Sequence, residues 1–157
     1  MINVLFVCLG NICRSPMAEA MFRDVVKREG LEKEIRIDSA GTGDWHVGHP
    51  PHQGTRQLLD SKGISYEGME ARQLKPADFS EFEYIIGMDA SNIGNINRLA
   101  PEKTQSKVLR LLDLVEQAKT RDVPDPYYTG NFEEVAQRID KGCEALLAMI
   151  KKDHSLS

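Results

Sequence analysis

The sequence has few cysteines, no long apolar run and no excess of positive charge. Its three cysteines in 157 residues are an odd number, which leaves at least one thiol free and favours a reducing compartment. No stretch approaches the ~18 apolar residues of a membrane span, and the short apolar run near the start lacks the flanking signals of a secretory leader. We therefore expect a cytoplasmic protein that does not enter a membrane.

The charge balance excludes a further class of partner. Twenty Lys and Arg stand against 24 Asp and Glu, for a net charge of -4. A general binder of nucleic acid needs a summed positive field, so we expect no nucleic-acid partner. The composition, 41% apolar and 28% charged, is that of a globular protein. The length predicts a single domain over residues 1–157, and nothing in the sequence requires more than a monomer.

Short apolar runs alternate with amphipathic segments along the chain. The runs predict strands at residues 3–7, 35–39 and 82–88. Helical spacing and capping residues predict helices that start at Ser15 and Pro16, at 55–62, after Asp89 and at 132–150. The run 108–112 is compatible with a strand or a helix. The alternation predicts an α/β fold with a parallel sheet covered on both faces, which binds ligands beyond the carboxyl ends of its strands.

The segment from Cys8 to Ser15 joins the first predicted strand to the first predicted helix. A Cys followed six residues later by an Arg arises by chance roughly one time in five in this composition, so its position carries the argument. Gly10 and Asn11 tolerate left-handed backbone angles, which let successive N–H groups point inward. The helix N-terminus adds more N–H groups, and Arg14 adds a planar fork for two phosphate oxygens. The segment therefore predicts a cradle for a phosphate dianion.

Cys8 lies at the base of this predicted cradle. The positive field there favours its thiolate, and a thiolate beneath a bound phosphate is placed for in-line attack on phosphorus. Ser15 can donate a hydrogen bond to the sulfur. An isolated cysteine at this place is more often a small apolar residue that ends a buried strand, but the residues around Cys8 favour the nucleophile.

The other two cysteines have different predicted roles. Cys13 either packs at the end of the loop or captures an oxidised Cys8 in a reversible disulfide, and we favour the second. Cys143 lies on the apolar face of the last predicted helix, where core packing is expected. A zinc half-site made by Cys8 and Cys13 is disfavoured, because the third cysteine lies on that core face.

The transfer of a phosphoryl group from an alcohol also needs an acid for the leaving oxygen. Asp125 is the best candidate, because its two flanking prolines stiffen the backbone and fix where the carboxyl group points. A closed site beside a bound anion would keep a proton on it, although an isolated Asp here would be an ordinary turn residue. Tyr127 and Tyr128 would form an aromatic wall for a flat leaving group, and Trp45, which lies in a polar loop, a second wall.

Three histidines, at residues 46, 49 and 52, suggest a metal site at first sight. Gly48, Pro50 and Pro51 prevent the helix that would align them on one face. Solvated loop histidines are therefore expected, and we expect neither a metal nor another cofactor.

Five segments, spread over nearly the whole length of the chain, resemble the low-molecular-weight protein tyrosine phosphatases. They are VLFVCLGNICRSPMAEA, IDSAGTGDWHVG, ARQL, YIIGMDASN and DVPDPYYTGNFEEV, of which the first and last are highly specific. The resemblance implies a four-stranded parallel sheet with helices on both faces, of the flavodoxin-like doubly wound kind. It also implies metal-free hydrolysis of phosphotyrosine in proteins, and of small aryl phosphates, through a cysteinyl-phosphate intermediate.

The same resemblance implies roles for individual residues. Cys8 attacks phosphorus, and Asp125 protonates the phenolate and then acts as base on the water that releases phosphate. Met69 stands where some members have a histidine that braces the loop, so that hydrogen bond should be missing or replaced. The other implied roles are phosphate binding by Leu9, Gly10, Asn11, Ile12, Cys13, Arg14 and Ser15, loop support by Asn11, Ser15 and Ser39, and substrate walls at Trp45, Tyr127 and Tyr128.

Other activities that could use this loop fit the sequence less well. Arsenate reductases of this fold need two relay cysteines in the second half of the chain, where only Cys143 occurs. Protein-arginine phosphatases carry Thr where Ile12 stands and lack the paired tyrosines, so phosphotyrosine is favoured. Outside these enzymes, a phosphocarrier would need neither Arg14 nor Asp125, and a phosphate-binding module would have no use for Cys8.

Overall fold

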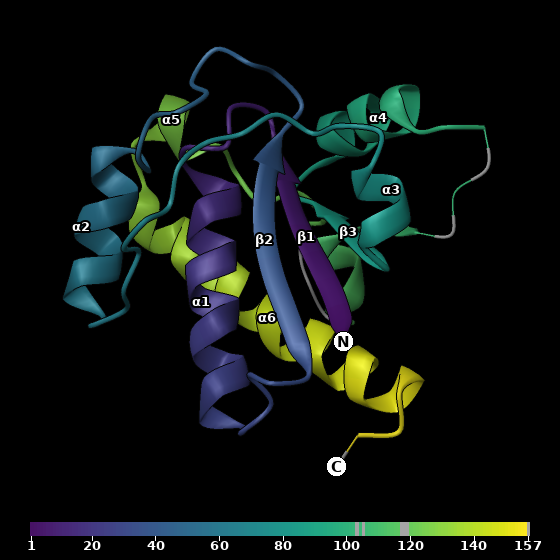
Figure 1. The fold of residues 1–157 in the computed structure, drawn as a ribbon. Coiled ribbons are helices and arrows are strands. Elements are labelled where there is room, and N and C mark those ends of the chain that lie inside the picture. Colours follow the sequence, from purple (N-terminus) through teal and green to yellow (C-terminus); the bar gives the residue numbers. More distant parts are fainter. Residues whose placement is uncertain (103, 105, 117–119, 157) are drawn as a thin grey trace.

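Four parallel strands form one sheet in the order β2-β1-β3-β4 (Figure 1). The computed structural model describes residues 1–102, 104, 106–116 and 120–156. The strands are β1 (Ile2–Cys8), β2 (Ile35–Gly41), β3 (Tyr84–Gly87) and β4 (Lys107–Arg110). The predicted parallel sheet is confirmed, with its four strands in a doubly wound order that reverses direction at β1.

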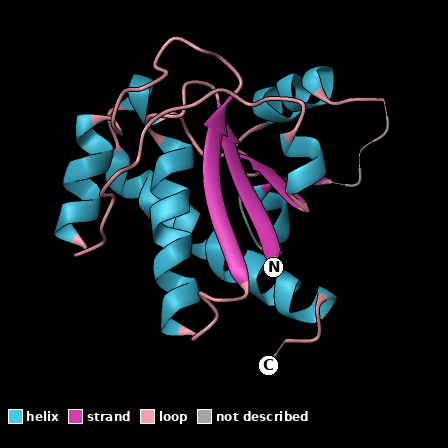
Figure 2. Ribbon diagram, in the orientation of Figure 1, coloured by secondary structure: helices cyan, strands magenta, loops and turns pink. Residues whose placement is uncertain are grey.

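Helices cover both faces of this sheet (Figures 1 and 2). They are α1 (Arg14–Arg28), α2 (Gln53–Ser61), α3 (Asp78–Glu81), α4 (Ala90–Leu99), α5 (Pro126–Thr129) and α6 (Phe132–Asp153), and a 3₁₀ helix, η1 (Leu111–Leu114), follows β4. Among the described residues, every helix is too short or too polar to span a lipid bilayer.

The central strand β1 is apolar at consecutive positions because both of its faces are buried. Val4 and Phe6 point to one core, which α1 and α6 fill with residues such as Cys143. Leu5 and Val7 point to the other core, beneath α3 and α4. Cys143 is fully buried, so the prediction that it packs in the core is confirmed.

The helix that follows the first loop begins earlier than expected. Cys13 occupies the N-cap position and Arg14 is the first helical residue, whereas Ser15 and Pro16 were predicted to be the cap and the first residue. The Ser15 hydroxyl does not cap the helix but lies 3.0 Å from the sulfur of Cys8. The prediction of the cap was therefore wrong, because the Ser15 hydroxyl instead contacts the Cys8 sulfur, the partner that the sequence had also suggested for it.

Two short helices were not predicted, and one ambiguous run is now assigned. Helices α3 and α5 have four residues each, too few to show a helical period. The run 108–112 contains the end of a strand followed by the start of a 3₁₀ helix, since β4 ends at Arg110 and η1 starts at Leu111.

Candidate active site

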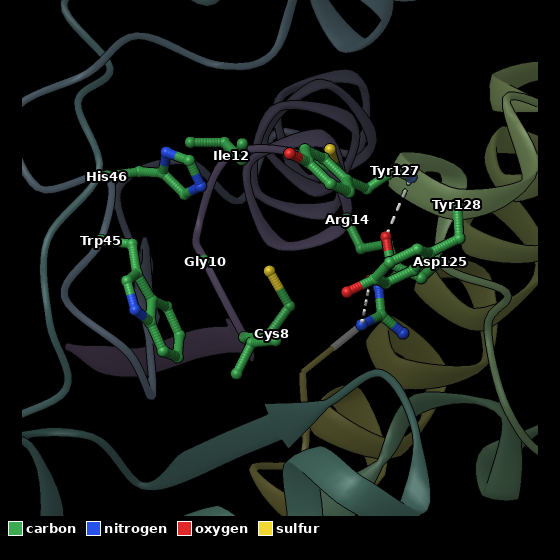
Figure 3. A pocket seen from close by; sticks show the side chains of 11 residues that line it. Cys8, Gly10, Ile12, Arg14, Trp45, His46, Asp125, Tyr127 and Tyr128 are labelled. Carbon is green, nitrogen blue, oxygen red and sulfur yellow. Dashed lines mark hydrogen bonds and ion pairs between the residues drawn. The ribbon is translucent and has the colours of Figure 1, made fainter.

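A pocket of about 260 Å³ opens at the carboxyl end of β1 (Figure 3). Its floor comes from the loop between β1 and α1, and its sides come from two distant segments that face each other across Cys8. The lining residues are Cys8, Leu9, Gly10, Ile12, Cys13, Arg14, Trp45, His46, Asp125, Tyr127 and Tyr128. The structure thus brings together the predicted nucleophile, arginine, acid and aromatic walls.

The floor loop turns sharply at Asn11, whose φ of 58° lies in the left-handed region. The same conformation was expected for Gly10, but Gly10 does not adopt it. A Cβ atom at residue 10 would lie 3.0 Å from the ring of His46, so that ring would have to shift slightly to admit a side chain there. Asn11 and Ser15 do not line the pocket and instead lie behind its floor.

A chain of hydrogen bonds runs behind the floor from Cys8. The Asn11 side-chain amide donates to Ser15 Oγ at 2.7 Å and to Ser39 Oγ at 3.0 Å. Ser15 Oγ in turn lies 3.0 Å from Cys8 Sγ, and it is the donor of that pair whenever Cys8 is a thiolate. Asn11 Oδ1 accepts from the backbone N–H of Arg72 at 2.9 Å. These contacts fix the loop around the sulfur.

The chain continues to a buried glutamate that the sequence analysis did not find. Ser39 Oγ donates to Glu19 Oε1 at 2.6 Å, and Arg23 pairs with the other carboxylate oxygen at 2.5 Å. Burial raises the pKa of Glu19, while Arg23 and the Ser39 hydroxyl act in the opposite direction. Met69, at the position where some members of the family have histidine, packs against the core, and no hydrogen bond of its side chain reaches the loop in the described part of the chain. The hydrogen bond that a histidine would make from this position is therefore missing here.

The backbone of the loop is also held by the chain that leaves β2. The N–H groups of Thr42 and Gly43 donate to the carbonyls of Cys8 and Leu9, at 3.0 and 2.9 Å. Gly41 permits this close approach, because a Cβ atom there would lie 2.8 Å from the Leu9 carbonyl oxygen. The carbonyls of the loop are therefore satisfied from outside the pocket.

Arg14 is buried beneath the pocket and held at one end of its guanidinium group. Nη1 donates to Asp89 Oδ2 at 2.6 Å and to the Val123 carbonyl at 2.9 Å, and Nη2 lies 3.5 Å from Asp125. Burial alone would lower the pKa of Arg14, but Cys8, Asp89 and Asp125 outweigh it and raise the pKa. The guanidinium is therefore a fixed cation next to Cys8.

Asp89 has two functions, of which the sequence revealed one. Its Oδ1 accepts from the backbone N–H of Asn92 at 2.7 Å and caps α4, as expected. Its Oδ2 binds Arg14. The two oxygens of this carboxylate therefore cap α4 and bind Arg14 at the same time.

The acid candidate, Asp125, is the N-cap of α5, and its Oδ1 accepts from the Tyr127 N–H at 3.0 Å (Figure 3). Its other oxygen faces Arg14. Tyr127 and Tyr128 pack edge to face with ring centroids 5.4 Å apart, and their side chains are 57% and 78% exposed. Trp45, 66% exposed, stands on the opposite side of the pocket with His46. A planar group entering the pocket would pass between these aromatic walls.

The three histidines do not all behave as solvated loop residues, which corrects that expectation. His46 lines the pocket and is half-buried, and His52 caps α2 through Nδ1, which accepts from the Gly54 N–H at 3.0 Å. Only His49 is exposed. Within the described residues no cluster of three His, Cys, Asp or Glu has a metal-binding arrangement.

Cys13 lines the pocket next to Cys8 but is buried. Burial, followed by the charges of Cys8 and Asp125, raises the pKa of Cys13 to about 12, so its thiol stays protonated. Burial also raises the pKa of Cys143. All three cysteines are free thiols.

A doubly wound parallel sheet whose first strand ends in a thiol at a helix N-terminus, with an arginine and a carboxyl group beside it, defines the class of cysteine-dependent phosphatases. Within that class, the model of the low molecular weight phosphotyrosine protein phosphatases matches residues 3–156. The chain belongs to that family, as the sequence resemblance indicated.

Similar proteins of known name agree over the full length. The low molecular weight protein-tyrosine-phosphatase YfkJ of Bacillus subtilis is 60% identical over 99% of this chain and 100% of its own. The crystal structure of YfkJ superimposes with a TM-score of 0.94 over 98% of this chain and 96% of its own. PtpA of Staphylococcus epidermidis is 46% identical, over 99% of this chain and 98% of its own chain. A Drosophila arginine phosphatase, DARP, is 32% identical, with a TM-score of 0.90 over 96% of this chain and 98% of its own.

Proposed function

We propose that the protein is a protein-tyrosine phosphatase that hydrolyses phosphotyrosine in proteins, and small aryl phosphates, through a cysteinyl-phosphate intermediate. The observation that carries the proposal is the placement of Cys8, Arg14 and Asp125 on one pocket, with the nucleophile between two aromatic walls. The names of the relatives support the same activity.

In the first step, the Cys8 thiolate attacks phosphorus and a sulfur–phosphorus bond forms as the bond to the phenolic oxygen breaks. Asp125 gives its proton to that oxygen, so the leaving group departs as a neutral phenol. In the second step, Asp125 takes a proton from water, the water oxygen bonds to phosphorus, and Cys8 leaves as a thiolate. The Ser15 hydroxyl, 3.0 Å away, stabilises that thiolate.

The phosphate oxygens would be held by the backbone N–H groups of Leu9, Gly10, Asn11, Ile12, Cys13, Arg14 and Ser15 and by the Arg14 side chain. Asp89 and the Val123 carbonyl occupy Nη1 of Arg14. Its Nε, and Nη2 in place of the long 3.5 Å contact with Asp125, would hold two oxygens of the phosphoryl group, a bidentate contact that strengthens as charge develops in the transition state. None of these steps needs a metal ion or another cofactor.

A protein-arginine phosphatase is the second candidate, favoured by the similarity to DARP. Ile12 and the tyrosine pair argue for phosphotyrosine, because an apolar side chain lines the pocket and aromatic walls suit a planar phenyl ring. An arsenate reductase fits less well, because Cys143 lies in the core and is fully buried.

Cys13 is proposed as a redox partner of Cys8. A peroxide would oxidise Cys8 to a sulfenic acid, and the Cys13 thiol would then form a disulfide with it and release water. Both sulfurs lie at the same pocket. We further propose that the protein works as a monomer on phosphotyrosine-containing proteins in the cytoplasm.

The test is hydrolysis of p-nitrophenyl phosphate and of matched phosphotyrosine and phosphoarginine peptides, with a chelator present. We expect hydrolysis of the aryl phosphate and the phosphotyrosine peptide, loss of activity in Cys8→Ser and Arg14→Ala, and the largest effect of Asp125→Ala on substrates with poor leaving groups. Robust activity of Cys8→Ser contradicts the covalent mechanism. A preference for phosphoarginine contradicts the substrate assignment.

A further inference from the structure

A second groove, of about 330 Å³, adjoins the pocket that holds Cys8. Leu9 and Trp45 line both spaces, so the two are separated only by these side chains. The rest of its lining comes from the chain after β2, at Thr42 and Gly43, and from the C-terminal half of α4. The groove is therefore within reach of a polypeptide that presents a phosphorylated side chain to Cys8.

The wall between the two spaces is built into the fold. The indole ring of Trp45 lies directly on the backbone of Gly43, since a Cβ atom at that residue would be only 1.9 Å from a ring carbon. The N–H of Gly43 is in turn bound to the carbonyl of Leu9 in the catalytic loop, at 2.9 Å. The packing thus ties the position of Trp45 to the loop that carries the chemistry.

The groove carries positive charge within a protein whose net charge is -4. Arg98 supplies this charge from the last turn of α4, where a cation also complements the helix dipole. Its guanidinium donates to Asn95 Oδ1, and no described carboxylate lies within ion-pair distance of it. Among the residues that the structure describes, the groove has no acidic lining residue. The exposed side chains of Trp45 and Leu99 give it apolar sides.

We propose that this groove is a substrate subsite that binds an acidic side chain, Asp or Glu, within about three residues of the phosphotyrosine. The proposal rests on the proposed function. An extended peptide advances about 3.3–3.6 Å per residue, so a side chain a few residues away reaches a space that shares a wall with the reaction pocket. The apolar sides would contact the methylene groups of that side chain, and Arg98 would bind its carboxylate.

The test compares phosphotyrosine peptides in an alanine background with a single Asp or a single Lys at each of the three positions on either side. We expect at least one Asp peptide to show about three- to fivefold higher kcat/KM than its Lys partner, mainly through KM, the size typical of an exposed ion pair. This preference should disappear in Arg98→Gln and reverse in Arg98→Glu. Hydrolysis of p-nitrophenyl phosphate, which does not reach the groove, should stay unchanged.

Arg28→Glu is the matched control. This substitution changes the net charge by the same amount as Arg98→Glu, but at an exposed residue at the C-terminal end of α1. The Arg28→Glu variant should prefer the Asp peptides as strongly as the unaltered protein does. The subsite is rejected if Arg98→Glu retains the preference, or if Arg28→Glu loses it equally. It is also rejected if all phosphotyrosine peptides are hydrolysed alike. Failure to hydrolyse any of them contradicts the proposed function itself.

Discussion

Asn11 combines two properties in one residue. Its backbone adopts a left-handed φ of 58°, which glycine and asparagine tolerate best, and its side chain makes three hydrogen bonds behind the catalytic loop. Glycine would satisfy the first requirement but not the second. The residue is therefore fixed by the shape of the loop and by its partners together.

A pair of substitutions at Asn11 separates these contributions. Asn11→Ala removes the hydrogen bonds and places a Cβ atom in the left-handed region, so we expect a loss of about 2–4 kcal/mol in unfolding free energy. Asn11→Gly removes the same bonds without the strain and should be about 1 kcal/mol more stable than Asn11→Ala. Urea denaturation measures the unfolding free energy of both variants. Equal stability of the two variants would show that the backbone is not strained at this residue.

Glu19 makes stability depend on pH. Its pKa in the folded protein is raised above the ordinary value of 4.5 by burial, so the folded state holds the proton more tightly than the unfolded state. The stabilisation from Glu19 is then fully present below the unfolded pKa and is lost as pH rises through the folded pKa. Glu19→Gln has no such titration. The unfolding free energy of the unaltered protein should therefore fall relative to that of Glu19→Gln as pH rises from about 4.5.

Denaturation at a series of pH values between 4 and 8 checks this expectation. A constant difference between the two proteins over the range would mean that burial does not disfavour the charged form. Kinetics on the same variant test the hydrogen-bond chain, because a change in kcat with unchanged KM would show that Glu19 positions the loop rather than the substrate.

The site residues that could be predicted from the sequence are those whose neighbours in the chain point to the same chemistry. Cys8 and Arg14 share one loop, and Asp125 stands between prolines. Glu19 and His46 could not be found in this way, because the contacts that link them to the loop, with Ser39 and Gly10, are made by residues distant in the sequence. Only packing brings such pairs together.

At the scale of elements, the apolar runs predicted the strands reliably, because a strand that is buried on both faces needs apolar residues at consecutive positions. The strand β3 is shorter at each end than predicted, since Phe82 and Met88 are buried outside the ladder. Helices α3 and α5 were missed, and α5 matters most, because it carries Asp125 at its N-cap and both tyrosines. A four-residue helix stabilised by one cap and one proline has too little pattern to be recognised.

Two glycines within helices should respond to alanine in opposite ways. In α6, a Cβ atom at Gly142 would lie 2.4 Å from Cγ of the buried Leu111, so Gly142→Ala should destabilise the protein by about 1–3 kcal/mol. In α4, no atom in the described part of the chain lies within 4 Å of a Cβ atom at Gly94, and Gly94→Ala should stabilise the protein by up to about 1 kcal/mol. Thermal or urea unfolding shows whether each substitution stabilises or destabilises the protein. Stabilisation by Gly142→Ala would mean that η1 moves away from α6 at little cost.

At the scale of the whole molecule, the three thiols lie in different environments although all are buried. Cys8 opens to the pocket beside the cation of Arg14, whereas Cys13 has a raised pKa and Cys143 is enclosed in the larger core. The odd cysteine count thus reflects two thiols at the pocket and one in the core, each in its own environment.

Alkylation with iodoacetamide should distinguish these environments. In the native protein at neutral pH we expect one fast modification, at Cys8, which inorganic phosphate slows by occupying the pocket. In denaturant all three cysteines should react at similar rates. Peptide mass spectrometry identifies the sites, and rapid native modification of Cys143 would show that the core opens readily.

The floor of the pocket is one continuous stretch of chain, from Cys8 to Arg14, whereas its rim comes from segments far away in the sequence, around Trp45 and Tyr127. Side-chain changes at the exposed rim residues Trp45, Tyr127 and Tyr128 therefore leave Cys8 and Arg14 in register, and the floor and the rim are free to evolve at different rates. Enzymes with new substrate preferences should arise by drift in the rim over an unchanged floor. Libraries randomised at Trp45, Tyr127 and Tyr128 are accordingly the economical route to altered specificity, and libraries in the floor loop should yield mostly inactive protein.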